Sequence, residues 1–129
     1  MFRTLSIFFI FLLLNVSSVS SSNFNYGSGY AAKSVLASQS LINAMDKVDN
    51  RIYAVGEHGI ILYSDDFGDS WTQAESVPYT STLTDISCSS KKSCWVTGHD
   101  ATILHSNDYG VTWIKQYEDL GWDAPLLSI

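Results

Sequence analysis

Short apolar runs, separated by polar and glycine-containing turns, occupy most of the chain after residue 40. Residues 52–55 and 60–63 combine β-branched, aromatic and aliphatic side chains, a composition that favours β-strands. No window keeps a helical period of apolar residues for about twelve positions. We therefore predict an all-β fold. The expected strands are residues 41–47, 51–56, 60–64 and 70–75, then 83–88, 94–98, 102–106 and 112–117.

This pattern of strands occurs twice, because residues 41–73 align with residues 83–115 without a gap. The offset is 42 residues. The matched pairs are Gly56/Gly98, Ile61/Ile103, Leu62/Leu104, Ser64/Ser106, Asp66/Asp108, Gly68/Gly110, Ser70/Thr112 and Trp71/Trp113. A period of about 40–50 residues with four strands per unit is typical of a β-propeller blade. We therefore predict a partial propeller with two four-stranded antiparallel blades, residues 41–82 and 83–124.

The last five residues resemble the beginning of the second unit. PLLSI at residues 125–129 is similar to TLTDI at residues 82–86, and we interpret it as the start of a third blade. Repeat folds need several units, because each unit covers its neighbour. An apolar strand without a neighbour also leaves an open edge. We therefore expect a fragment of a longer protein, and the alternative is self-association of several copies through the open blade edge.

The first residues are typical of a secretory signal peptide. Arg3 precedes an apolar run at residues 5–14, and small residues follow it. The run is shorter than the ~20 residues that span a bilayer. We predict a signal peptide at residues 1–22 and export to the periplasm or the medium, with a retained N-terminal anchor as the alternative. Residues 23–40, rich in Ser, Gly and Ala, are expected to form a linker or lead-in segment.

Charge and cysteine content narrow the expected partners and ligands. Without Arg3 the mature chain has 6 basic and 13 acidic residues, a net charge of −7, which disfavours nucleic acid as a partner. Cys88 and Cys94 enclose five residues, and export permits a disulfide between them. Two free thiols are the alternative. A single pair lacks the four ligands of a structural zinc site, and we expect no metal and no cofactor.

Two equivalent octets, SDDFGDSW and SNDYGVTW, share the pattern Ser-x-Asp-aromatic-Gly-x-Ser/Thr-Trp. The aspartate can accept hydrogen bonds from N–H groups of its own turn, and the glycine supplies a positive φ. The Ser/Thr begins the next strand, and the tryptophan is expected to bury its surface between neighbouring blades. These structural positions are Ser64, Asp66, Gly68, Ser70 and Trp71, and Ser106, Asp108, Gly110, Thr112 and Trp113.

A calcium site built on Asp65 and Asp66 is the alternative for the first octet. Calcium takes about six to eight oxygen ligands. The second octet has Asn107 in place of Asp65 and Val111 in place of Asp69. A repeat that loses two of three carboxylates but retains Ser, Asp, Gly and Trp preserves the geometry of a turn. We therefore assign the octets a structural role.

The octets resemble the Asp-box, or bacterial neuraminidase repeat, which joins the third and fourth strands of a propeller blade. With AVGEHGIILYSDDFGDSW and GHDATILHSNDYGVTW, residues 41–129 also resemble the photosystem II stability/assembly factor family. The bacterial relatives of that family from organisms without photosystems are the most similar. The resemblance implies a seven-bladed propeller of about 300 residues, of which this chain holds two blades. It also implies a role in photosynthesis and a lumenal location if the host is photosynthetic.

The function that the resemblance implies is a non-catalytic scaffold, which binds another protein during assembly of a membrane-associated complex. The loops between the second and third strands of a blade lie on the face where propellers usually bind partners. These loops carry Glu57, His58, His99 and Asp100, which we take as candidate partner-binding residues. Solvated hairpin tips are the alternative. Assembly factors of the family dock through an arginine-rich surface, whereas the mature chain has only Arg51.

Glycan binding or a sialidase-like activity is the alternative function. Sialidases hold the carboxylate of the substrate with three arginines, because the guanidinium fork fits that group. Arg51 alone does not supply such a set, and no spacing resembles a nucleophile elbow. We therefore expect no catalytic residues. A glycan-binding protein would use Tyr79, Tyr117 or Trp122 as stacking platforms.

Overall fold

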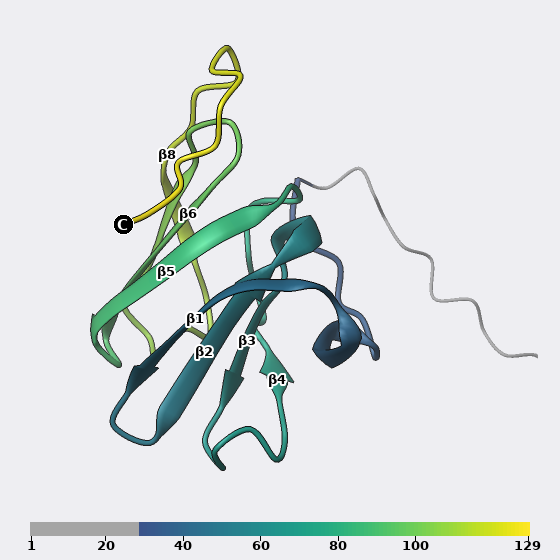
Figure 1. The fold of residues 1–129 in the computed structure, drawn as a ribbon, viewed down its shortest axis with the longest axis vertical. Coiled ribbons are helices and arrows are strands. Elements are labelled where there is room, and N and C mark those ends of the chain that lie inside the picture. The colour runs from purple at the N-terminus through teal and green to yellow at the C-terminus, as the bar shows by residue number, and fades with distance from the viewer. Residues whose placement is uncertain (1–28) are drawn as a thin grey trace, which may run out of the picture.

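A computed structural model describes residues 29–129, which form two four-stranded antiparallel sheets (Figure 1). Each sheet follows the order of the sequence, β1-β2-β3-β4 and β5-β6-β7-β8. The all-β fold class is confirmed, and the two sheets correspond to two blades of a partial propeller. The predicted signal peptide lies outside the described residues. The strands are β1 Ile42–Val48, β2 Arg51–Gly56, β3 Ile61–Ser64, β4 Thr72–Gln73, β5 Leu83–Ser90, β6 Ser93–Gly98, β7 Ile103–Ser106 and β8 Ile114–Tyr117.

The last strand of each sheet, β4 or β8, is shorter than the sequence predicts. β4 covers only Thr72–Gln73, although the predicted strand was 70–75. Ser70 is held in the preceding turn, because its N–H donates to a carboxylate oxygen of Asp66. Beyond β4 the chain leaves its own sheet, and the N–H of Glu75 donates to the carbonyl of Val111, in the turn between β7 and β8. β8 likewise begins two residues later than predicted.

The largest buried cluster lies between the two sheets. From the first sheet, Tyr53, Val55 and Ile61 are fully buried. They pack against a set of side chains from the second sheet and its approach, all with 4% exposure or less. That set consists of Ala74, Val77, Tyr79, Leu83, Ile86, Cys94, Val96, Leu104 and Trp113. Burial of these apolar groups is the main force that holds the sheets face to face.

Hydrogen bonds also join β1 and β5, the first strands of the two sheets. The side-chain amide of Asn43 in β1 donates to the carbonyl of Leu83 at 2.8 Å. The N–H of Cys88 in β5 donates to a carboxylate oxygen of Asp46 at 2.7 Å. Cys88 and Cys94 lie directly opposite each other on β5 and β6 and form a disulfide, so the predicted bridge is confirmed.

Residues 31–39, within the predicted lead-in segment, cover part of the face of the first sheet that points away from the second sheet. They include a short 3-10 helix, η1 (Ala37–Gln39), and Ala37 packs with Ala54, Ile60 and Leu62. The sequence did not predict this contact, because the segment has no periodic apolar pattern.

Trp71 differs from the expectation that it packs between neighbouring blades. Its indole is only partly buried, and it lies against the cluster of Ala37, Ala54 and Leu62. The reason is that the face of the first sheet that carries Trp71 points away from the second sheet. Trp113, the equivalent residue, does lie between the sheets and is 3% exposed.

The segment after β8 returns to β5, the first strand of the second sheet. Residues 125–129 form no strand. The N–H of Leu126 donates to the carbonyl of Gly98 at 3.1 Å, and the hydroxyl of Thr84 in β5 donates to the carbonyl of Leu126. The second contact parallels the bond from Asn43 in β1 to Leu83. The start of a third blade stays a prediction.

No helix among residues 29–129 is long and apolar enough to cross a membrane.

Candidate functional site: two equivalent aspartate turns

The first octet forms a turn in which one aspartate accepts several hydrogen bonds. The hydroxyl of Ser64, at the end of β3, donates to Asp66 Oδ1 at 2.7 Å. The N–H and the hydroxyl of Ser70 donate to the two carboxylate oxygens of Asp66 at 2.9 and 2.6 Å. Ser64 Oγ in turn accepts from the N–H of Gly68 at 2.8 Å. The carboxylate therefore fastens the end of β3 to the beginning of β4.

The second octet repeats this arrangement between β7 and β8. The hydroxyl of Ser106 donates to Asp108 Oδ1 at 2.8 Å, and the N–H of Gly110 donates to Ser106 Oγ at 3.0 Å. The N–H and the hydroxyl of Thr112 donate to Asp108 at 2.9 and 2.5 Å. Trp113 adds a bond from its indole Nε1–H to the carbonyl of Gly110 at 3.0 Å. Because the same bonds recur, the shared residues of the octets are those that the turn needs.

These hydrogen bonds favour the ionised form of both aspartates. Bonds from the hydroxyl and N–H of Ser70, with a further bond from Ser64, lower the pKa of Asp66 from 3.8 to about 2. At Asp108, partial burial raises the pKa, but the bonds from Thr112 and Ser106 outweigh it, so the pKa lies below its ordinary value. A carboxylate whose oxygens are occupied in this way is poorly suited to act as a general base or acid at neutral pH.

The remaining carboxylates of the first turn have other roles. Arg51 in β2 forms a forked contact with Asp65, with distances of 2.8 and 2.5 Å to its two oxygens. The guanidinium also lies over the ring of Tyr63, at 4.4 Å from the centroid, and donates to the carbonyl of Tyr109, in the turn of the second octet, at 2.7 Å. The hydrogen bond from Arg51 lowers the pKa of Asp65. The side chain of Asp69 makes no hydrogen bond within the described part of the chain.

The octets hold their glycines and the preceding aromatic residues in the left-handed region. φ is 59° at Phe67 and 98° at Gly68, and it is 67° at Tyr109 and 77° at Gly110. Glycine adopts such values without the steric cost of a Cβ atom. At Gly110 there is a second requirement, because a Cβ would lie 2.6 Å from Cε1 of Tyr53.

The candidate partner-binding residues lie on the equivalent loops after β2 and β6. The side chains of His58 and His99 are exposed, and those of Glu57 and Asp100 are half-buried. φ is positive at His58 (56°) and at Asp100 (55°), the equivalent position 42 residues later. None of the four side chains makes a hydrogen bond or an ion pair within residues 29–129. The structure thus places them at the same end of two adjacent sheets without joining them into one cluster.

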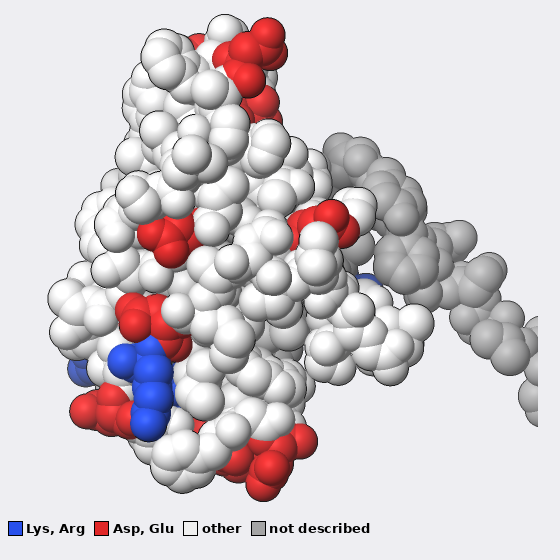
Figure 2. Space-filling view, viewed as in Figure 1, with Lys and Arg blue, Asp and Glu red and all other residues white. Residues whose placement is uncertain are grey.

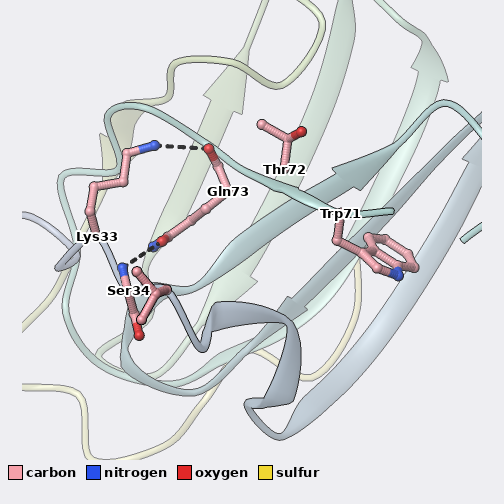
Figure 3. A pocket seen from close by; sticks show the side chains of 6 residues that line it. Lys33, Ser34, Trp71, Thr72 and Gln73 are labelled. Atoms are coloured by element: carbon pink, nitrogen blue, oxygen red, sulfur yellow. Dashed lines mark hydrogen bonds between the residues drawn. The ribbon is translucent and has the colours of Figure 1, made fainter. Parts of the chain in front are cut away.

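An open cleft of about 420 Å³ lies between the lead-in segment and β4. Figure 3 shows Lys33 and Ser34 on one side of it, with Gln73 between them and the indole of Trp71. Lys33 Nζ donates to the carbonyl of Gln73, and the N–H of Ser34 donates to the side-chain oxygen of Gln73, both at 2.9 Å. Sequence reasoning missed this cleft, because its two walls lie about 40 residues apart in the chain.

The expected stacking platforms for a glycan differ in their exposure. Tyr79 is 3% exposed, and its hydroxyl donates to the carbonyl of His99 at 2.8 Å. Its inclusion among the platforms is therefore wrong, because its ring belongs to the core between the sheets. Tyr117 and Trp122 are both more than half exposed. The cleft beside Trp71 offers no further support for glycan binding, because the side chain of Gln73 already bonds to the lead-in segment.

The charged residues do not gather into a single binding surface in the view of Figure 2. Acidic side chains appear at both ends of this face and between them, and Lys or Arg appears beside acidic groups at the end away from the turn of the segment after β8. Among the residues that the structure describes, no group of three or more His, Cys, Asp or Glu side chains is arranged to hold a metal ion.

Comparisons with known proteins do not assign a family. No protein-family model matches the sequence, and no curated protein matches it.

Proposed function

We propose that the chain is a non-catalytic, exported propeller module that acts as a protein-binding scaffold in the assembly of a membrane-associated complex. The observation that carries this proposal is how the carboxylates of the octets are used. Asp66 and Asp108 each bond to both ends of their own turn. The two carboxylates stabilise the turns between β3 and β4 and between β7 and β8. They leave few oxygens free to bind a substrate or a metal. The resemblance to the photosystem II stability/assembly factors supports the same role.

The loops after β2 and β6 supply the surface that a partner would contact. They lie at the same end of neighbouring sheets, and each carries an exposed histidine, His58 or His99, beside a half-buried carboxylate, Glu57 or Asp100. Because these side chains have no hydrogen bond or ion pair within residues 29–129, binding would break no internal contact. The disulfide between Cys88 and Cys94 is compatible with export.

The proposal is tested by deleting the gene in its source organism and following membrane complexes by native electrophoresis. We expect assembly intermediates to accumulate in the deletion strain, and the wild-type chain to restore the mature complex. The variant His58→Asn/His99→Ala should reach the same protein level without restoring it. Asn at position 58 suits the positive φ there.

The matched control is Asn107→Ala, an exposed position on the turn at the opposite end of the second sheet. We expect this variant to restore assembly as the wild type does. Normal accumulation of every membrane complex in the deletion strain would show that the proposed function is wrong.

A further inference from the structure

The candidate partner-binding loops after β2 and β6 both bond to the segment between β4 and β5. The part of that segment that reaches them is residues 79–82, which we call the connector. Its Ser81 carbonyl accepts from the N–H of Gly59 at 2.7 Å, in the loop after β2. Its Thr82 carbonyl accepts from the N–H of His99 at 3.0 Å, in the loop after β6. The connector therefore ties the backbone of both loops to one short stretch of chain.

Tyr79, the first residue of the connector, also reaches the loop after β6 with its side chain. Its hydroxyl donates to the carbonyl of His99 at 2.8 Å, and the residue is 3% exposed. A Cβ atom on Gly98 would lie 3.1 Å from Cε1 of this ring, so the ring packs closely against the end of β6. The carbonyl of His99 also accepts from the N–H of Thr102 at 3.0 Å. Two donors therefore fix this peptide group, one within the loop and one from the connector.

The internal repeat shows that the bond from the tyrosine is particular to the loop after β6. The position 42 residues before Tyr79 is Ala37, and the position 42 residues before His99 is Glu57. The carbonyl of Glu57 accepts from the N–H of Ile60 at 3.0 Å, which is the equivalent bond within the loop. Alanine has no hydroxyl that could add a second bond. The turn therefore forms without the tyrosine, and the hydroxyl serves to fix where the turn lies.

We propose that Tyr79 is a positioning residue, which fixes the loop after β6 in the place from which His99 and Asp100 contact a protein partner. The inference rests on the proposed function, because it takes the two loops as the surface that binds the partner. A loop that is fixed before binding loses less conformational freedom when the partner binds. Loss of the hydroxyl therefore weakens binding of the partner without unfolding the protein.

The test compares Tyr79→Phe, which removes the hydroxyl and retains the ring, with Tyr53→Phe as the matched control. Tyr53 belongs to the same buried cluster, and its hydroxyl also donates to a backbone carbonyl, that of Tyr109, at 3.3 Å. Tyr109 lies in the turn of the second octet, at the opposite end of β7 from the loop after β6. Because each variant loses one hydrogen bond of a buried ring, we expect both to fold with similar urea midpoints.

Amide hydrogen exchange of the purified chain, followed by NMR, measures how firmly the loop after β6 is held. In Tyr79→Phe the amides of His99 and Thr102 should exchange about three- to tenfold faster than in the wild type, which is the effect of losing one ordinary hydrogen bond. In Tyr53→Phe these two amides should exchange at the wild-type rate. Unchanged exchange in Tyr79→Phe, or an equal increase in both variants, would overturn the proposal.

Expression of the same two variants in the deletion strain tests the role in binding a partner. At equal protein level, we expect Tyr79→Phe to restore less of the mature membrane complex than the wild type, and Tyr53→Phe to restore it fully. Full restoration by Tyr79→Phe, together with none by His58→Asn/His99→Ala, would overturn this inference and leave the proposed function standing. Normal accumulation of every membrane complex in the deletion strain would contradict the proposed function and, with it, a partner-binding role for Tyr79, whatever the exchange rates.

Discussion

Asp65 and Asp66 are neighbours in the first octet, yet their carboxylates have unrelated partners. Asp66 bonds to Ser64 and Ser70 within its own turn, and the repeat retains all three positions. Asp65 pairs with Arg51 across the sheet, and the second unit has neither residue, since Asn107 and Ser93 stand in their places. The internal repeat therefore predicted the turn correctly, but it did not reveal the ion pair. Its partners lie 14 residues apart on separate elements, and no local pattern marks them.

The depressed pKa of Asp66 predicts a loss of stability in acid. Its folded pKa of about 2 is below the ordinary 3.8, so its contribution is fully present above about pH 4 and is lost as pH falls toward 2. We expect the free energy of unfolding to decrease with pH over this window less steeply in Asp66→Asn than in the wild type. Urea unfolding at a series of pH values measures this slope.

Asp69→Asn is the control for the acid prediction, because it removes the same charge from the same turn. Its side chain makes no hydrogen bond within residues 29–129, so the wild-type slope between pH 4 and pH 2 should be retained. Equal slopes in wild type and Asp66→Asn would contradict the assignment of the acid sensitivity to the turn.

The two glycines of the octets should respond differently to alanine. Both have positive φ, so Gly68→Ala should cost about 1 kcal/mol through backbone strain. Gly110→Ala adds a Cβ at 2.6 Å from the buried ring of Tyr53, whereas the nearest atom at Gly68 would be 3.7 Å away, on Trp71. We therefore expect Gly110→Ala to cost about 1–3 kcal/mol more. Chemical unfolding of both variants measures the difference, and equal costs would show that Tyr53 moves aside freely.

At the scale of secondary-structure elements, the repeat predicted the strands well and the segments outside it poorly. β2 has the predicted bounds, and β3 and β7 each differ by one residue. β4 and β8 are shorter because hydrogen bonds of the octets hold their first predicted residues in the turn. The 3-10 helix at Ala37–Gln39 was missed, because it forms on the surface of the first sheet and has no pattern of its own.

The hairpin of β5 and β6 is the element whose stability depends on a covalent bond. Cys88 and Cys94 occupy opposed positions, with Cα atoms 4.1 Å apart. The double variant Cys88→Ala/Cys94→Ala should lower the free energy of unfolding by ~2 kcal/mol, chiefly because the unfolded chain gains freedom. Reduction of the wild-type chain is the control, since it opens the loop but retains both sulfurs. An unchanged urea midpoint after complete reduction would contradict the prediction.

At the scale of the whole molecule, stability depends on how the faces of the sheets are covered. The face between the sheets is covered by the second sheet, and the other face of the first sheet is partly covered by residues 31–39. The second sheet and residues 31–39 bury the tryptophans of the two octets to different extents. Trp113 is 3% exposed and bonds to Gly110, whereas Trp71 is partly exposed beside a cleft of about 420 Å³. A short segment with one short helix therefore replaces a neighbouring sheet incompletely.

This difference predicts unequal costs for the same substitution at equivalent positions. Trp113→Ala should lower the free energy of unfolding by about 3–5 kcal/mol, because it leaves a large cavity in the cluster that joins the sheets. Trp71→Ala should cost about 1–2 kcal/mol, since its indole already contacts solvent and less apolar surface is lost. Urea unfolding followed by far-UV circular dichroism compares the two. Equal costs would mean that residues 31–39 stabilise the first sheet as strongly as the second sheet does, and that Trp71 is held as firmly as Trp113.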